Sequence, residues 1–346
     1  MSTADRFEHV LVTGGAGFIG AELVPELLDR GHRVTVLDLF AFGREPLAPV
    51  AEHPQLELVE GDIRDREAVD RTITDDVDAV IHLAAISNDP SSKLDAELTT
   101  SVNRDGVQQV MEIAADRVDR LIYASSASVY GIKEREEVTE DLELEPITLY
   151  ADYKAEGERA LADLTGPDVC GTAVRAATVC GYSPRLRLDL VVNILTAHAL
   201  SEGRIRVFGG EQMRPNVHIR DIVDFYVRLL GADRRVIQEE AFNVSRANHT
   251  VMGLAELIRD ELDRDVEITV EPSDDDRSYH LSAEKARRQL GFEPNRSIRR
   301  AVRDLETAWE EGRFETHDAP IHHNVDWMRE HPADWDWDGR RYLRSE

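Results

Sequence analysis

The sequence predicts an α/β fold in which a doubly wound parallel sheet of the Rossmann type is followed by a smaller C-terminal lobe. Three observations support this prediction. Strand-like apolar runs alternate with helical patterns through the first half of the chain, a glycine-rich turn follows the first run at residues 13–20, and the alternation loosens beyond about residue 180. Regular alternation of this kind produces parallel strands joined by right-handed crossovers.

Each strand is expected where a short apolar run is followed by turn residues. The expected strands cover residues 10–12, 34–37, 56–59, 79–83, 121–124 and 171–175. Helical patterns predict one long helix at 98–118, a second at about 149–164 and a third at 222–230. A compact segment near 250–300 is expected to complete the second lobe.

The turn at residues 13–20, Thr-Gly-Gly-Ala-Gly-Phe-Ile-Gly, predicts a dinucleotide site. Gly14 permits the tight turn, Gly17 lets backbone N–H groups approach a pyrophosphate, and Gly20 lets the following helix pack on the strand. The helix N-terminus adds unpaired N–H groups and a positive dipole end, both of which attract phosphate. The predicted cofactor contacts in this turn are Gly14, Gly17, Phe18, Ile19 and Gly20.

The ends of the next strands carry further predicted cofactor contacts. Asp38 ends the second strand, where a carboxylate accepts hydrogen bonds from the adenosine ribose and repels a 2′-phosphate, so NAD is favoured over NADP. Arg44 lies nearby and could soften this preference. Asp62 is placed to meet the adenine edge, although a carboxylate there could also serve a turn or a helix N-cap. The remaining predicted contacts are Ile63, Leu83, Ala84 and Ala85.

Tyr150 and Lys154 are the candidate catalytic pair. They stand four residues apart in a predicted helix, so both side chains lie on one face. A lysine ammonium beside a phenol stabilises the phenolate, which can then exchange a proton with a sugar hydroxyl while hydride moves to or from nicotinamide. Ser126, at the end of the fifth strand, would hydrogen-bond the same oxygen. The spacing alone is common by chance, but only four of the 41 basic residues are lysine, and one falls here.

The charge of the chain is strongly negative, with a formal net charge of −27 spread over its whole length. An acidic surface that is rich in arginine and almost free of lysine is typical of proteins from salt-loving organisms. In molar salt the Debye length falls to about 3 Å, so self-repulsion is screened and the charge serves solubility. The same charge argues against a nucleic-acid partner.

Composition also predicts a cytoplasmic protein without metal or membrane partners. No apolar stretch approaches the roughly 20 residues of a membrane span, and residues 1–9 lack the pattern of a signal peptide. Cys170 and Cys180 have no metal-site or disulfide spacing and are expected to be buried thiols. His322 and His323 are adjacent, so they do not face one way on a helix or strand, and no metal site is predicted.

Together these motifs resemble the extended short-chain dehydrogenase/reductases, and more narrowly the nucleotide-sugar epimerase/dehydratase family, over about residues 8–300. The resemblance implies that Ser126, Tyr150 and Lys154 form a catalytic triad, that Lys154 also holds the nicotinamide ribose together with Tyr150, and that Asn103 braces the active-site backbone beside the cofactor. It further implies a nucleotide-diphosphate sugar as substrate and a homodimer built on two helices. The substrate contacts implied are Ser87, Ser126, Thr178, Asn193, Arg214, His218 and Arg277.

Several residues depart from the family pattern, and one of these departures disfavours one of the family's reactions. Dehydratases of the group carry an Asp-Glu pair after the catalytic hydroxyl residue, but this chain has Ala127 and Ser128, which disfavours 4,6-dehydration. Thr178 replaces an asparagine that often contacts sugar. Arg185 and Arg187, in the loop expected to face the sugar, are further differences.

The leading hypothesis is an NAD-dependent epimerase of the UDP-sugar 4-epimerase type, which oxidises sugar carbon 4 transiently. A 4-ketosugar reductase or sugar dehydrogenase using NAD or NADP is the alternative, and a non-catalytic cofactor-sensing protein is disfavoured by the intact triad. We expect residues 8–180 to form the NAD-binding domain, with later segments returning to it, and 181–315 to form mainly the nucleotide-sugar-binding lobe. Residues 316–346 are expected to form an extended tail packed by its aromatic side chains.

Overall fold

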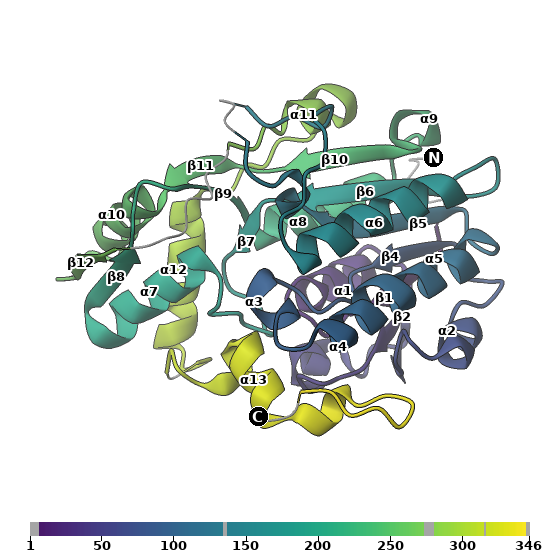
Figure 1. The fold of residues 1–346 in the computed structure, drawn as a ribbon, viewed down its shortest axis with the longest axis horizontal. Coiled ribbons are helices and arrows are strands. Elements are labelled where there is room, and N and C mark those ends of the chain that lie inside the picture. The colour runs from purple at the N-terminus through teal and green to yellow at the C-terminus, as the bar shows by residue number, and fades with distance from the viewer. Residues whose placement is uncertain (1–6, 134–136, 273–279, 315, 344–346) are drawn as a thin grey trace.

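A seven-stranded parallel sheet forms the centre of the molecule (Figure 1). The computed structural model describes residues 7–133, 137–272, 280–314 and 316–343. The strands lie in the order β10-β6-β5-β4-β1-β2-β3, and every neighbouring pair is parallel. Their bounds are β1 His9–Thr13, β2 Arg33–Asp38, β3 Leu56–Glu60, β4 Ala79–His82, β5 Arg120–Ser126, β6 Cys170–Ala176 and β10 Glu240–Val244. The Rossmann-type sheet expected from the sequence is therefore confirmed.

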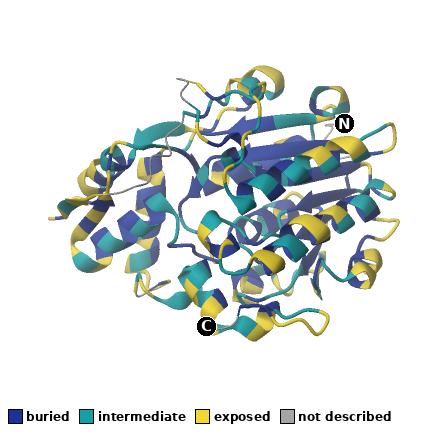
Figure 2. Ribbon diagram, in the orientation of Figure 1, coloured by how far each residue is buried: buried dark blue, intermediate teal, exposed yellow. Residues whose placement is uncertain are grey.

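Helices cover both faces of this sheet, and for that reason its inner strands are largely apolar rather than alternating, whereas β3 at the edge exposes Glu57 and Glu60. One layer holds α2 (Arg66–Thr72), α4 (Ala96–Thr100), α5 (Val107–Ala115) and α6 (Leu149–Leu164). The opposite layer holds α1 (Gly20–Asp29) and α8 (Ile219–Leu230), which pack against each other. Figure 2 shows the strands between these layers as the most buried part of the fold. β1, for example, is buried along its whole length.

The single helix expected at 98–118 is wrong in one respect, because it is interrupted. A π-helical turn, η3 (Ser101–Gly106), separates α4 from α5. Turns of this kind are rare and often occur next to functional sites, because the wider turn redirects side chains. Here the redirected residue is Asn103, whose side-chain amide reaches the backbone of Ile86. The sequence did not show this interruption, since Val102 is the one large apolar residue between Ser101 and Gly106 and the turn is too short for its period to be distinguished from that of an α-helix.

The second lobe has its own core and lies beside the carboxyl ends of the sheet strands (Figure 1). Its longer helices are α7 (Val191–Glu202), α10 (Val251–Glu261) and α12 (Ile298–Glu310). Two small sheets complete it: β11 (Ala247–Thr250), β9 (Met213–His218) and β7 (Thr178–Cys180) in one, and β12 (Glu267–Glu271) with β8 (Arg204–Phe208) in the other. Three further short helices are α3 (Asp89–Ser92), α9 (Arg234–Ile237) and α11 (Glu284–Leu290).

The C-terminal segment is not the extended tail that the sequence predicted. It forms η5 (Pro320–His322), α13 (Asn324–Glu330) and η6 (Pro332–Trp335), and it folds back onto the first domain (Figure 1). Met328 and Trp335 are buried there, in the same hydrophobic cluster as residues of the central sheet. No helical period was visible because each element spans seven residues or fewer.

Two expectations from composition can be compared directly with the structure. Cys170 and Cys180 are both buried free thiols, as expected. Among the described residues, no helix is long and apolar enough to cross a bilayer.

Replacing Gly157 by alanine should destabilise the fold, because α6 lies unusually close to the sheet at this position. A Cβ on Gly157 would be 2.5 Å from the hydroxyl oxygen of Tyr123, a fully buried side chain of β5 that cannot easily move. Overpacking of this size costs about 1–3 kcal/mol. Chemical unfolding at molar salt measures the loss. Gly166→Ala is the control, since nothing lies within 4 Å of its Cβ; equal stability of the two variants would contradict this packing.

Candidate functional site

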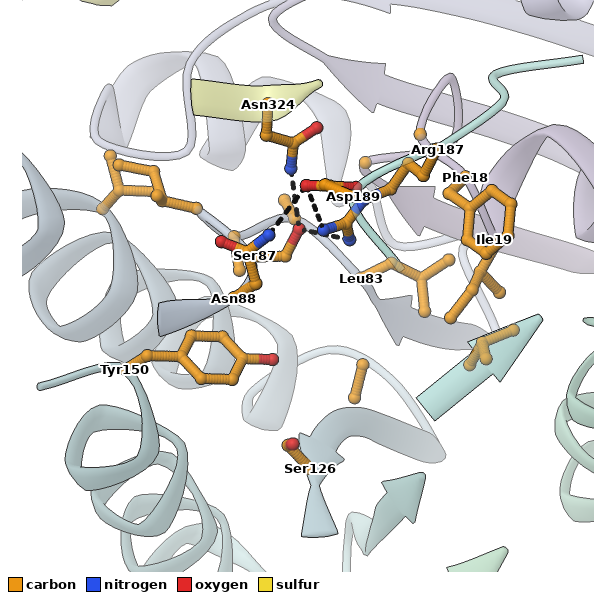
Figure 3. A pocket seen from close by; sticks show the side chains of 18 of the residues that line it. Phe18, Ile19, Leu83, Ser87, Asn88, Ser126, Tyr150, Arg187, Asp189 and Asn324 are labelled. Atoms are coloured by element: carbon orange, nitrogen blue, oxygen red, sulfur yellow. Dashed lines mark hydrogen bonds and ion pairs between the residues drawn. The ribbon is translucent and has the colours of Figure 1, made fainter. Parts of the chain in front are cut away.

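A cavity of about 650 Å³ opens at the carboxyl edge of the central sheet, between the glycine turn, the strand ends, the second lobe and the C-terminal segment (Figure 3). Most of the predicted site residues line it, although they come from distant parts of the chain. They are Gly14, Gly17, Phe18, Ile19, Gly20, Asp38, Asp62, Ile63, Leu83, Ala84, Ala85, Ser87, Ser126, Tyr150, Lys154, Thr178 and Arg214.

The glycine turn forms a cradle that side chains would fill. Gly14 has a φ of +71°, and a Cβ there would lie 2.8 Å from the backbone nitrogen and Cα of Ala84. A Cβ on Gly20 would lie 2.5 Å from the carbonyl oxygen of Gly15. No side chain caps the N-terminus of α1, which begins at the cavity. Backbone N–H groups and the helix dipole are therefore available to a phosphate, and the residues present fit a dinucleotide.

Backbone N–H groups of two neighbouring turns hold the side chain of Asp38 in place at the end of β2. Its carboxylate accepts hydrogen bonds from the N–H groups of Ala16, at 2.9 Å, and Phe40, at 2.8 Å. Burial raises the pKa of this carboxyl, while the two backbone hydrogen bonds oppose the rise. Arg44, which could have softened the preference for NAD, is paired with Glu60 at 2.5 Å and lies over the ring of Phe40.

Asp62 serves a turn in this structure, which is the second of the two roles considered for it. Its carboxylate accepts from the backbone N–H of Arg64 at 2.8 Å and forms a salt bridge with the guanidinium of Arg64 at 2.6 Å. Arg64 also donates to the carbonyl oxygen of Trp335, at 3.2 Å. The carboxylate still lines the cavity, but it is already held by a cation that links it to the C-terminal segment.

Tyr150 and Ser126 extend into the same cavity from different elements (Figure 3). Tyr150 lies in the first turn of α6, whose N-terminus is capped by Thr148: the Thr148 hydroxyl accepts from the N–H of Ala151 at 3.2 Å. Ser126 is the last residue of β5, and its hydroxyl accepts from the N–H and hydroxyl of Ser128, at 3.2 and 2.9 Å. The phenol of Tyr150 and the hydroxyl of Ser126 therefore line the same cavity.

Lys154 lies one turn after Tyr150 and is buried beside it. Its Nζ donates to the carbonyl oxygen of Ala124 at 2.7 Å and lies 5.8 Å from the centre of the Tyr150 ring. Burial lowers the pKa of Lys154 to about 8, and Glu158, a further turn along α6, opposes this shift. An ammonium with so low a pKa is easily perturbed by the charge of its neighbours, as functional lysines are.

A buried polar network supports this face of α6 from behind. Glu158 forms a salt bridge with Arg175 at 2.6 Å and also accepts a hydrogen bond from Ser125. Arg175 donates to the hydroxyl of Tyr130 at 2.7 Å, and Tyr130 donates to Asn243 at 2.8 Å. The network joins α6 to β5, β6 and β10, so it fixes the helix that carries Tyr150 and Lys154.

Asn193 does not line the cavity, which corrects the direct substrate contact expected of it, and Asn103 also lies outside the cavity, in the bracing role expected of it. Asn103 accepts from the N–H of Ile86 and donates to its carbonyl, each at 2.8 Å, so it braces a cavity residue instead of reaching the cavity. Asn193 is fully buried; it accepts from Gly181 N–H at 2.9 Å and donates to two carbonyl oxygens, those of Gly181 and Arg187. Their amides are consumed by backbone partners.

His218 does not contact the cavity, which corrects the substrate contact expected of it. The Nε2 of His218 is 3.0 Å from the carboxylate of Asp304, and its Nδ1 accepts from the N–H of Arg220 at 3.1 Å. His218 is buried and does not line the cavity, so it caps α8 rather than contacting a ligand. Arg277 lies outside the described residues.

Sequence reasoning missed a polar cluster on one wall of the cavity (Figure 3). Arg187 pairs with Asp189 at 2.9 Å and donates to the hydroxyl of Ser87 at 3.0 Å. Asn88 donates to Asp189 at 2.8 Å, and Asn324 donates to Ser87 at 3.4 Å. Arg187 departs from the family pattern and its partner Asp189 is two residues away, but the other contacts of the cluster join residues 100 or more positions apart, so the cluster was not visible in the sequence.

The C-terminal segment provides a second wall that the sequence did not show. Met328 and Trp335 line the cavity, and Trp335 meets the ring of Phe42 edge to face at 5.9 Å. Arg185 lies 3.9 Å above that ring and donates to Asn324 at 2.6 Å. Arg185 therefore lies at the end of the cavity near Asp38, because the half-buried ring of Phe42 and the C-terminal segment hold it there.

Comparisons with known proteins agree with this geometry. The family model described as "NAD dependent epimerase/dehydratase family" matches residues 10–245. The chain is 30% identical over 321 residues to a UDP-glucose 4-epimerase from Lactobacillus helveticus, covering 87% of this chain and 96% of that protein. It is 30% identical over 307 residues to UDP-glucuronic acid decarboxylase 1 of Arabidopsis thaliana, covering 85% and 68%.

A solved structure with a similar fold contains NAD. It is the dTDP-glucose 4,6-dehydratase of Streptomyces venezuelae with NAD bound, which is 28% identical and has a TM-score of 0.77. The match covers 88% of this chain and 98% of that one. Relatives with three different activities thus share this fold.

Lys154→Met should stabilise the folded protein near neutral pH. Methionine is an unbranched, uncharged side chain of similar length, whereas the folded state disfavours the charge on Lys154, whose pKa falls from 10.5 to about 8. Below pH 8 the folded chain must bury the charge, so the variant should gain up to about 3 kcal/mol in free energy of unfolding. Between about pH 8 and 10.5 the unfolded wild type binds the proton that its folded state lacks, so wild-type stability rises with pH and the difference shrinks.

Chemical unfolding across this pH range tests the prediction. Lys93→Met is the matched control, since Lys93 is exposed. A Lys154→Met variant that is less stable at every pH would show that the hydrogen bond to Ala124 outweighs the cost of burying the charge.

Proposed function

Because the chain belongs to the NAD-dependent epimerase/dehydratase family, we propose that it is an NAD-dependent 4-epimerase acting on a nucleotide-diphosphate sugar. One observation carries the proposal. Tyr150 and Ser126 share a cavity, and the two residues that follow Ser126 in the chain are Ala127 and Ser128. Neither side chain is an acid or base that could move protons at sugar carbons 5 and 6. The cavity therefore supports chemistry at one carbon better than dehydration.

In this proposal the triad moves one proton. NAD+, held by the glycine cradle and Asp38, would supply the acceptor for hydride from sugar carbon 4 and the donor for its return to the opposite face of the sugar. The phenolate of Tyr150 accepts the proton of the 4-hydroxyl as hydride leaves, and gives it back when hydride returns. The buried ammonium of Lys154 stabilises the phenolate and contacts the nicotinamide ribose, while Ser126 hydrogen-bonds the sugar oxygen. Atoms and charge balance over the cycle, so no external oxidant is consumed.

Different residues of the cavity would bind different parts of the dinucleotide. The cradle of Gly14, Gly17 and Gly20 would hold the pyrophosphate, and Asp38 would accept hydrogen bonds from the adenosine ribose. Trp335, on the wall beside Asp38, would cover the adenosine half. An epimerase ends each cycle with its cofactor in the starting oxidation state, so a wall that retains NAD suits this function.

On the substrate side, Ser87, Thr178 and Arg214 line the cavity and are the proposed contacts to the nucleotide sugar. The planar guanidinium of Arg214 suits a diphosphate. A homodimer through α5 and α6, an acidic surface adapted to high salt and a cytoplasmic location complete the proposal.

A net oxidoreductase is the alternative, since a 4-ketosugar reductase or sugar dehydrogenase would use the same triad. The two functions differ in the fate of the cofactor, which an epimerase keeps and an oxidoreductase exchanges.

A screen of UDP-, GDP- and dTDP-sugars at molar salt distinguishes these functions. We expect one sugar to be converted to its 4-epimer with no net change in the absorbance of reduced nicotinamide, measured with chromatography of the products. Tyr150→Phe should lower turnover by at least about 100-fold through loss of the proton acceptor, yet keep NAD bound. Steady cofactor consumption would favour the oxidoreductase, release of carbon dioxide a decarboxylase, and full activity of Tyr150→Phe would refute the mechanism.

Trp335→Ala should weaken retention of NAD, because it removes a wall of the cavity. We expect the dissociation constant for NAD to rise by about tenfold or more, since a buried aromatic side chain contributes over 1 kcal/mol to a contact. Trp337→Ala is the matched control: Trp337 belongs to the same segment but stacks on Arg64 outside the cavity. Equal NAD affinities for the two variants would remove Trp335 from the cofactor site.

A further inference from the structure

Three potential metal ligands meet on the second lobe, and none of them lines the cavity described above. His198 and Glu202 are one turn apart on α7, and His317 belongs to the segment that follows α12. One ligand atom from each lies within 4.8 Å of the other two. The Nε2 of His317 is 3.1 Å from Glu202 Oε1, and the two imidazole rings meet edge to face with centroids 4.7 Å apart.

The hydrogen bonds of Ser201 fix the tautomer of His317. The Ser201 hydroxyl donates its one hydrogen to the carbonyl oxygen of Ala197 at 2.8 Å, so toward the Nδ1 of His317, at 3.0 Å, it can only accept. Nδ1 of His317 therefore carries a hydrogen, and in the neutral ring Nε2 carries a lone pair. That lone pair faces a carboxylate oxygen of Glu202. Two acceptors at this distance repel each other unless a cation, either a proton or a metal ion, lies between them.

The surroundings favour a metal ion over a proton. Within the described residues, the Nδ1 of His198 is buried without a hydrogen-bond partner. A proton shared between His317 and Glu202 would leave this nitrogen without a partner, whereas a metal ion can be bound by one atom of each of the three residues.

The donor set matches one class of ion. Two imidazoles and one carboxylate, with a fourth position open to water, are typical of zinc and similar borderline divalent metals. Ligand atoms about 2 Å from a tetrahedral ion lie about 3.3 Å apart, close to the 3.1 Å between His317 and Glu202. Ser201 then acts as the outer hydrogen-bond partner that orients a metal-bound histidine. We infer that His198, Glu202 and His317 form a binding site for a divalent transition metal of the zinc type.

Such a site would fix the start of the C-terminal segment to α7. The Nε2 of His323 lies 2.6 Å from the carbonyl oxygen of His317, and His323 lines the cavity. The metal ligands and the cavity wall are therefore joined by a short stretch of chain. Metal binding does not depend on the proposed epimerase activity, and its test uses no substrate.

The test is a titration of untagged, chelator-treated full-length protein with zinc chloride at molar salt, against a chromophoric chelator. We expect one equivalent to bind, and His198→Gln, Glu202→Gln and His317→Gln each to weaken affinity by at least about tenfold, since a lost ligand removes a coordinate bond. His53→Gln, remote from the cluster in the loop before β3, is the control for histidine content. Cobalt(II) substitution should give the intense visible absorption of a tetrahedral site, lost in His317→Gln.

Circular dichroism and retention of NAD show whether each variant is folded. Absence of saturable one-to-one binding by the wild-type chain would overturn the inference and leave a protonated His317 paired with Glu202. Binding that survives in folded His198→Gln and His317→Gln would overturn it equally, since the ion would then lie elsewhere.

Discussion

The close approach of two backbone segments at the carboxyl edge of the sheet is the constraint on which the whole site depends. Gly14 follows β1 and meets Ala84, which follows β4, so closely that no side chain fits between them. The two strands are hydrogen-bonded neighbours, and the pairing of Thr13 with His82 sets their register. Thr13 and His82 also share a buried hydrogen bond of 2.6 Å, and burial lowers the pKa of His82 to about 3, so this contact stays uncharged.

The catalytic side of the cavity is built at a cost in stability. A buried ammonium is unfavourable unless hydrogen bonds and counter-charge offset its desolvation, and Lys154 has one carbonyl partner and the more distant carboxylate of Glu158. Glu158 is itself tied to Arg175, which limits how much it can neutralise the lysine. Perturbed groups of this kind gather at functional sites, where stability is given up for chemistry. In a chain with four lysines, the one with a strongly shifted pKa lies beside the phenol.

Arginines rather than lysines hold the C-terminal segment on the first domain. Arg64 pairs with Asp62 and lies 5.5 Å from the ring centres of Trp337 and Tyr342, while Arg185 stacks on Phe42. Exposed ion pairs are screened in concentrated salt, whereas stacking and buried hydrogen bonds are not. A guanidinium serves both purposes, because it stacks on aromatic faces and donates to several acceptors at once. This use of arginine is consistent with the acidic, lysine-poor composition of the chain.

The sequence by itself determined the parallel sheet, the glycine cradle, the strand-end position of Asp38 and the pairing of Tyr150 with Lys154. These features depend on periodicity and spacing within a few residues, and such patterns are written locally in the chain. The tertiary structure alone decided which polar residues became braces and what closed the cavity. Asn193 is bound to a backbone 12 residues away, His218 to a carboxylate 86 residues away, and Trp327 of the C-terminal segment to a carbonyl 286 residues away. A side chain's role is set by the partner that folding brings to it, and no local pattern records partners at such separations.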